Sequence, residues 1–177
     1  GAWQAKKAKL KERILKIAEG LIRTAAAREL KPGDVLPPPE GAYEEFAARF
    51  PYEETEDQLT AIEAVIEDFQ KGRPMDRLVC GDVGFGKTEV ALRSAFVAAM
   101  NGKQVAVVVP TTLLARQHFA TFQARFKGLP INIAQASRMV PKKELDQVKA
   151  GIASGDIDIV VGTHALLADS IKFRDLG

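Results

Sequence analysis

The feature that most constrains the fold is an eight-residue motif at Gly81–Thr88. It follows the pattern G-x-x-x-x-G-K-[ST], with the apolar tripeptide Leu78–Cys80 before it and the helix-forming run Thr88–Met100 after it. In this context such a motif joins a buried strand to the first turn of a helix. We therefore expect a strand at Leu78–Cys80, within a parallel sheet that is flanked by helices.

The chemistry of this motif favours phosphate binding. Glycines let successive backbone N–H groups surround an anion, and the N-terminus of the following helix adds further donors. In this interpretation Lys87 neutralises the β- and γ-phosphates of a nucleotide, and the Thr88 hydroxyl is a ligand of Mg²⁺. The alternative is a glycine-rich turn with a solvated lysine. The residues expected at the nucleotide are Gly81, Asp82, Val83, Gly84, Phe85, Gly86, Lys87, Thr88 and Glu89.

After the motif, short apolar runs alternate with helical patterns of about 10–15 residues, which is typical of strand–helix–strand units. This order predicts parallel strands joined by right-handed crossovers, in an α/β sheet covered by helices on both faces. The further strands are expected at Val105–Val109, Ile131–Ala136 and Ile157–Val161, and the helices between them at Leu113–Phe126 and Glu144–Ala153.

The N-terminal residues predict a long amphipathic helix without proline. Its apolar residues recur at spacings of three and four, at Leu10, Ile14, Ile17, Leu21 and Ala25. Residues 1–31 hold nine Lys and Arg against three Glu, a net charge of +6, whereas the remaining residues have a net charge of −4. A solvent-exposed face of the helix explains this run of charges; the alternative is that the basic face binds along DNA. Because one narrow stripe cannot bury itself, we expect this helix to lie on another surface.

The chain divides into three parts. Prolines at positions 32 and 37–39 end the first helix and predict an extended connection. We therefore expect a linking helix at 1–30, a proline-rich linker at 31–42 and an α/β domain at 43–177.

Composition narrows the class of protein further. The single cysteine, Cys80, excludes a disulfide scaffold and fits a reducing compartment. We expect it to be a small buried core residue without chemistry. Since no run approaches the about 18 apolar residues of a membrane span, we expect a cytoplasmic protein.

Thr55 and Gln58 have the spacing of a helix-capping box, just before the apolar pattern that ends at Phe69. The Gln58 amide either closes this box or donates to and accepts from the edge of an adenine. Both roles stay open on the residues alone.

Hydroxyl groups follow two of the expected strands, in Pro110-Thr111-Thr112 and in Gly162-Thr163-His164. The carboxyl ends of parallel strands collect functional groups. Hydroxyls and backbone N–H groups there suit nucleic-acid phosphates without sequence preference. Helix capping by Thr112 and Thr163 explains them equally well. No Asp or Glu follows either strand, so the carboxylate that phosphoryl transfer needs is not evident.

Four segments closely resemble the first motor domain of the bacterial transcription-repair coupling factors, a family of RecG-like superfamily-two double-stranded DNA translocases. They are FPYEETEDQ at 50–58, MDRLVCGDVGFGKTEVA at 75–91, VPTTLLA at 109–115 and GTH at 162–164. The resemblance in motor motifs covers about residues 43–177. Residues 2–39 look like the long helix and hook-like linker that precede this motor.

The resemblance implies a RecA-like P-loop NTPase fold that binds ATP and Mg²⁺. Gln58 would read adenine next to Phe50 or Tyr52, in addition to capping its helix. The DNA-contacting motifs would include Pro110, Thr111, Thr112, Gly162, Thr163 and His164, with Arg138 close to the same surface.

In the family a strand ending in Asp-Glu-Glu-His follows shortly after the position of Gly177, and a second lobe carries an arginine finger. We therefore expect a truncated motor with little or no hydrolysis of its own. Double-stranded DNA would bind the motor, while RNA polymerase and the damage-recognition protein would bind other domains.

Three alternatives remain. The nearest is the fork-reversing helicase RecG, whose motor is closely similar. A non-catalytic module that docks a partner through the first helix would leave that helix resistant to mild proteolysis at Lys6–Arg13. A small-molecule kinase would need an acceptor pocket, and no sequence feature supplies one.

Overall fold

The computed structural model describes residues 2–82 and 86–177. The expected helices and the last three expected strands are present, with boundaries within two residues of the predicted ones. The helices are α1 (Ala2–Leu30), α2 (Ala42–Ala48), α3 (Glu56–Phe69), α4 (Lys87–Met100), α5 (Thr112–Arg125) and α6 (Lys142–Ser154), the strands are β1 (Val105–Val108), β2 (Ile133–Ala136) and β3 (Ile159–Gly162), and a short 3-10 helix, η1 (His164–Leu167), follows β3.

The three strands form a sheet in the order β1-β3-β2. They are parallel, as the alternation of strands and helices predicted. The central strand β3 is buried along its whole length. Val108 of β1 and Ala136 of β2 are both aligned with Gly162 of β3. The carboxyl ends of the three strands therefore lie at one edge of the sheet.

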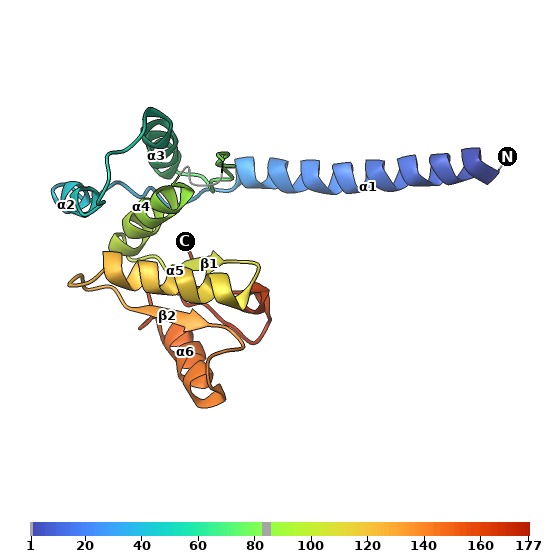
Figure 1. The fold of residues 1–177 in the computed structure, drawn as a ribbon. Helices are drawn as coiled ribbons and strands as arrows, with labels where there is room; N and C mark the ends of the chain where they lie inside the picture. Colours follow the sequence, from blue (N-terminus) through green and yellow to red (C-terminus); the bar gives the residue numbers. More distant parts are fainter. Residues whose placement is uncertain (1, 83–85) are drawn as a thin grey trace.

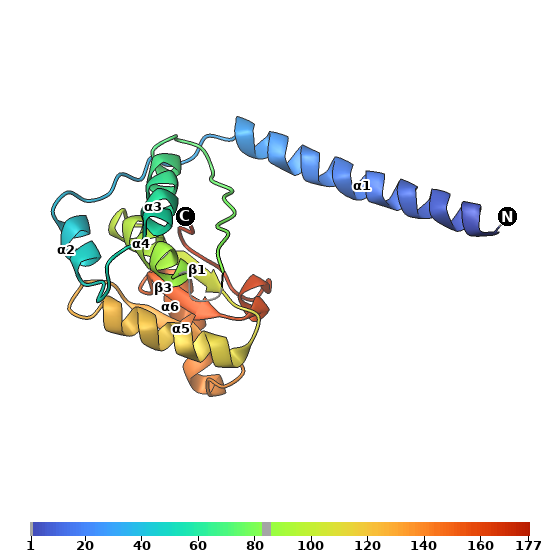
Figure 2. The same ribbon diagram turned by 45° about the horizontal axis from the view of Figure 1, so that its top comes forward.

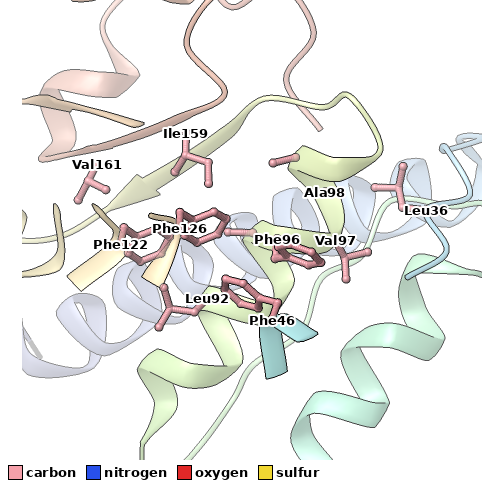
Figure 3. Close-up of a cluster of buried hydrophobic side chains, with 12 residues drawn as sticks. Leu36, Phe46, Leu92, Phe96, Val97, Ala98, Phe122, Phe126, Ile159 and Val161 are labelled. Carbon is pink, nitrogen blue, oxygen red and sulfur yellow. The ribbon is translucent and has the colours of Figure 1, made fainter. Parts of the chain in front are cut away.

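Helices cover both faces of this sheet. Successive residues of a strand point to opposite faces, so neighbouring residues of one strand contact different helices. Ile159 and Val161 contact the core formed with α4 and α5, whereas Val160 packs on the side of α6. Figure 3 shows the first core, where Phe96 of α4 stacks on Phe46 of α2 with ring centroids 4.3 Å apart. The prediction of an α/β sheet covered on both faces is confirmed.

The long helix α1 extends away from the rest of the molecule, with the N-terminus at its far end (Figures 1 and 2). None of its residues, Ala2–Leu30, is buried. Its last turn is joined to the body by two ion pairs, Arg28 with Asp76 and Glu29 with Arg73. Among the described residues, no helix is long and apolar enough to cross a membrane.

The proline-rich segment after α1 packs along the body. The Leu36 N–H donates to the carbonyl oxygen of Phe69 at 2.9 Å, and the Leu36 side chain is buried in the α4–α5 core. Gly33 approaches the chain so closely that a Cβ there would lie 2.8 Å from the backbone of Arg73. The linker therefore follows a fixed path past the end of α3.

The strand expected at Leu78–Cys80 is absent, so this prediction is wrong. The tripeptide lies outside the sheet; Leu78 is 86% exposed and only Val79 packs, against the cluster between α3 and α4. A strand needs a neighbour for its backbone hydrogen bonds, and no described strand lies beside this one. For the same reason Cys80 is exposed, and not a buried core residue as expected.

Candidate nucleotide-binding site

The glycine-rich loop meets helix α4 at Gly86, and the local geometry requires glycine there. Gly86 caps α4 with a left-handed backbone, φ 79°, which side chains with a Cβ rarely adopt. A Cβ at Gly86 would lie only 2.0 Å from Nε2 of Gln58. The loop and the Gln58 amide are therefore in close contact, although residues 58 and 86 are far apart in the sequence.

Lys87 is the first residue of α4, and its ammonium group contacts the backbone at the start of the glycine-rich motif. Its Nζ donates to the carbonyl oxygens of Gly81 and Asp82, the latter at 2.9 Å. The first turn of a helix also offers backbone N–H groups that lack intrahelical partners. Val83, Gly84 and Phe85, which were expected to bind the nucleotide, lie outside the described residues.

The capping box predicted for α3 is confirmed. The Gln58 N–H donates to Oγ1 of Thr55 at 3.2 Å, and the Thr55 N–H donates to Oε1 of Gln58 at 2.9 Å. This pair of bonds fixes the buried Gln58 amide, so that Nε2 points toward Gly86. The capping role of Gln58 is thus confirmed, and its contact with a base stays a prediction.

A cleft of about 580 Å³ brings together six of the residues that the sequence assigned to nucleotide binding, but Gly81, Asp82 and Lys87 do not line it; Lys87 lines a neighbouring pocket with Val90 and Ala91. The cleft is lined by Phe50, Tyr52 and Gln58 from one stretch and by Gly86, Thr88 and Glu89 from the start of α4. Phe50 and Tyr52 meet edge to face, with ring centroids 5.6 Å apart. An aromatic wall facing a helix N-terminus suits a ligand with a flat ring and an anionic tail.

Sequence reasoning missed six residues of this cleft: Pro51, Glu53 and Thr55, which adjoin predicted ones, Leu92 of α4, and Thr121 and Arg125 of α5. Arg125 lies 5.9 Å from the ring centroid of Phe50 and 4.6 Å from that of Phe46. Its position depends on how α5 packs across α4, since 36 residues separate it from Glu89, to which it donates at 2.7 Å. No local pattern in the sequence signals such a contact.

Thr111 caps the N-terminus of α5, so the predicted cap, Thr112, is wrong by one residue. Oγ1 of Thr111, and not of Thr112, accepts from the Leu114 N–H at 3.2 Å, because Thr111 keeps an extended backbone just before the helix. Thr112 is already the first residue of α5. Pro110 and Thr111 are both exposed at the end of β1.

The end of β3 combines buried and exposed groups. Gly162 faces the Ala136 carbonyl oxygen, which a Cβ would approach to 2.3 Å, so glycine is needed here for sheet packing. Thr163 is buried and precedes η1, but its side chain makes no capping hydrogen bond, which corrects the expected cap. His164 is exposed, as is Arg138 beyond the end of β2. Since the strands are parallel, these residues share one edge with Pro110, Thr111 and Thr112.

A parallel sheet covered by helices, with the motif G-x-x-x-x-G-K-[ST] at the start of a core helix, defines a nucleotide-binding α/β domain of the RecA-like type. Residues 55–177 match the family model of the DEAD/DEAH box helicases. The chain therefore belongs to the DEAD/DEAH box helicase family.

Similarity to curated proteins extends along the whole chain and confirms the expected resemblance. The transcription-repair-coupling factors of Haemophilus influenzae and Bacillus subtilis are 50% and 47% identical to it, each over 99% of this chain. That of Rickettsia prowazekii is 51% identical over the same share. The chain spans only 15% of the length of the first two proteins and 16% of the third.

Two solved structures resemble the fold. The structure of RecG bound to a three-way DNA junction matches 88% of this chain and 21% of that chain, with a TM-score of 0.81 and 34% identity. A hypothetical ATP-dependent RNA helicase from Sulfolobus tokodaii matches 73% of this chain and 35% of that chain, with a TM-score of 0.55 and 22% identity. The second likeness concerns the fold alone.

Proposed function

We propose that this chain is the ATP-binding part of the motor of a double-stranded DNA translocase that couples transcription to nucleotide-excision repair by displacing stalled RNA polymerase. The observation that carries the ATP-binding role is the cleft in which Phe50, Tyr52 and Gln58 face the first residues of α4. Identities of 47% to 51% with transcription-repair-coupling factors, against 34% with RecG, favour this role over fork reversal.

The residues of the cleft fit a magnesium nucleotide. Gly86 keeps the loop free of a Cβ where Gln58 approaches it, and the half-buried Thr88 lines the cleft. In this proposal Lys87, between these two residues in the sequence, would neutralise the β- and γ-phosphates. In this proposal the Thr88 hydroxyl holds Mg²⁺, which would neutralise charge on the phosphates. Nε2 of Gln58 would donate to the base, while its Oε1 stays in the capping box.

The sheet edge is the proposed DNA surface. Thr111, Thr112 and His164 would contact backbone phosphates, with Arg138 adding positive charge from the end of β2. Pro110, Gly162 and Thr163 would shape the surface, since Gly162 and Thr163 are buried. Such contacts fix the position of the protein on DNA and carry no sequence information.

We expect the chain alone to hydrolyse ATP at close to the background rate. Among the described residues that follow the three strands, at 109–111, 137–141 and 163, none is acidic. A carboxylate that holds Mg²⁺ and a group that orients water are both required for fast phosphoryl transfer. In the proposed motor a second lobe would complete the cleft, and its opening and closing would move the DNA contacts along one strand.

A calorimetric titration with Mg-ATP and Mg-GTP tests the nucleotide site. We expect ATP to bind more tightly than GTP, and Lys87→Ala to abolish binding, because the variant removes the cation placed at the phosphates. Lys143→Ala, on the exposed face of α6, is the matched control and should leave binding unchanged. Equal affinity for both nucleotides would contradict adenine reading by Gln58, and binding that survives in Lys87→Ala would contradict the role of Lys87.

Two variants at Thr111 separate helix capping from DNA binding. Asp is as good a cap as Thr, so Thr111→Asp should retain stability while Thr111→Ala loses about 0.5–2 kcal/mol. If the edge contacts phosphates, the added negative charge of Thr111→Asp should weaken duplex binding more than Thr111→Ala does, and equally for unrelated sequences. Unchanged DNA binding in Thr111→Asp would remove Thr111 from the proposed surface.

A further inference from the structure

Glu89 follows the phosphate-binding motif directly, and its buried carboxylate accepts hydrogen bonds from two arginines. It is 2% exposed, and its Oε1 accepts from Nε of Arg93 at 2.8 Å and from Nη2 of Arg125 at 2.7 Å. A buried carboxylate is expensive unless it is paired and hydrogen-bonded, and these two guanidinium groups meet that need. Glu89 therefore links α4 to α5 at the side of the cleft.

Arg93 extends this network to the loop between α2 and α3. Its guanidinium is buried, and Nη2 donates to Oε1 of Glu54, the residue before the capping Thr55. This hydrogen bond lowers the pKa of the Glu54 carboxyl below its usual range. Glu54, Arg93, Glu89 and Arg125 thus form one ion-pair network across three parts of the molecule.

The two arginines of this network also contact Phe50, one of the two aromatic residues that form the wall of the cleft. The Cζ atoms of Arg93 and Arg125 lie 6.0 and 5.9 Å from the centroid of the Phe50 ring. Phe50 in turn contacts Tyr52, the most exposed residue of the wall, edge to face. A guanidinium within about 6 Å of a ring is attracted to its face. Phe50 is therefore held by both arginines.

Arg125 has a further property that separates it from a simple ion-pair partner. Its Nε and Nη1 are buried and find no hydrogen-bond acceptor among the described residues. The same guanidinium lies 4.6 Å from the centroid of Phe46. Contact with aromatic rings, together with the Glu89 ion pair, is thus what keeps this side chain in place.

We propose that Arg93 and Arg125, held by Glu89 and Glu54, are positioning residues that fix Phe50 and Tyr52 as the wall on which a purine base rests. This inference rests on the proposed ATP binding. In it, the network supports the contact with the base of the nucleotide and not the contact with its phosphates. Glu89, which the sequence placed among the nucleotide ligands, acts through the two arginines. The side chains of this network do not include Thr88, which also lines the cleft, or Lys87, which lies outside the lining.

The test compares two ligands that differ only in having a base and sugar. Affinities for Mg-ATP and for Mg-tripolyphosphate are measured by calorimetry on the chain and on Arg125→Met. We expect Arg125→Met to weaken ATP binding at least tenfold and tripolyphosphate binding less than twofold. Arg116→Met, at an exposed position of the same helix, is the matched control and should change neither affinity.

Glu54→Gln is a milder second variant, because Glu54 is partly exposed and the amide still offers an acceptor to Arg93. It should lower ATP affinity by a smaller factor and again leave tripolyphosphate binding unchanged. An equal loss for both ligands, or unchanged ATP binding in Arg125→Met, would overturn the positioning role. Failure of the unaltered chain to bind either ligand would overturn the proposed nucleotide site itself, and this inference with it.

Discussion

Helices α1 and α4 show how differently two helices of one chain can be stabilised. The first has 29 residues and none of them is buried. The second has 14 residues, nine of which are buried, including Phe96 and Val97 with no exposed surface. The short helix starts at the glycine-rich loop, and the long one carries eight of the 25 Lys and Arg residues of the chain against three Glu.

The contrast in burial between α1 and α4 shows that the formation of a helix and its burial have separate causes. Alanine and long straight side chains are sufficient to favour α1 locally. In α4, packing against the sheet, α2 and α3 determines which residues are fixed and where the helix begins. We therefore expect changes in α4 to affect both stability and the cleft, and changes in α1 to stay local.

The largest effect is expected for Phe96→Ala. Phe96 is fully buried between Phe46, Phe126 and β3, so removing its ring should cost about 3–5 kcal/mol of unfolding free energy. Urea unfolding followed by circular dichroism measures this loss. Ile17→Ala in α1 is the counterpart and should change the free energy by less than about 0.5 kcal/mol, as is usual for surface positions. A large effect of Ile17→Ala would show that α1 is buried in solution.

Gly86→Ala should disturb the backbone at the start of α4. An added Cβ meets left-handed backbone strain of about 1–2 kcal/mol, and it also collides with Nε2 of Gln58. Gly102 has the same φ of 79° with nothing within 4 Å, which makes Gly102→Ala a control for strain without collision. We expect calorimetry to show at least a tenfold loss of ATP affinity in Gly86→Ala only. Equal losses in both variants would mean that the contact with Gln58 is unimportant.

Gly20→Ala tests the other helix and should have the opposite sign. Gly20 lies in the middle of α1 with no atoms within 4 Å of an added Cβ. Alanine is favoured over glycine in a helix interior by about 1 kcal/mol. Hydrogen exchange should therefore slow within α1, while the amides of α4 keep their rates. Slower exchange in α4 as well would contradict the independence of the two helices.

A small pH effect is expected where α1 joins the body. Asp68 accepts from Arg77 and Lys71, and these hydrogen bonds lower its pKa from 3.8 to about 2. A lowered pKa means that this stabilisation is present above about pH 4 and is lost as the pH falls toward 2. Unfolding at a series of acidic pH values should show a shallower loss in Asp68→Asn than in the unaltered chain. Asp146→Asn, on the exposed surface of α6, should follow the unaltered chain.

Much of the fold could be predicted because its signals are local. The period of apolar residues gave α4, α5, β1 and β3 to within two residues, and the capping box at Thr55 and Gln58 followed from their spacing. The tripeptide Leu78–Cys80 has the same apolar character as β3 but stays outside the sheet. Composition marks a segment as able to form a strand, whereas hydrogen bonds to a neighbouring strand decide whether it does.

The candidate site divides in the same way. Lys87 and Thr88 were found from a motif whose spacing reflects the geometry of one turn. Arg125 could not be found, because its place beside Phe50 and Glu89 results from how α5 packs across α4. The exact cap of α5 depended on the backbone of a single residue, Thr111.

Local sequence patterns were sufficient to predict the α-helices, the alternation of parallel strands with helices, and the glycine-rich motif. These depend on propensities and spacings that act over a few residues. Only the tertiary structure decided that Glu89 is buried between two arginines, that Cys80 is exposed, and that Gln58 faces Gly86. These features arise from packing between segments distant in the sequence, where burial and hydrogen bonding are set by the partner and not by the residue alone.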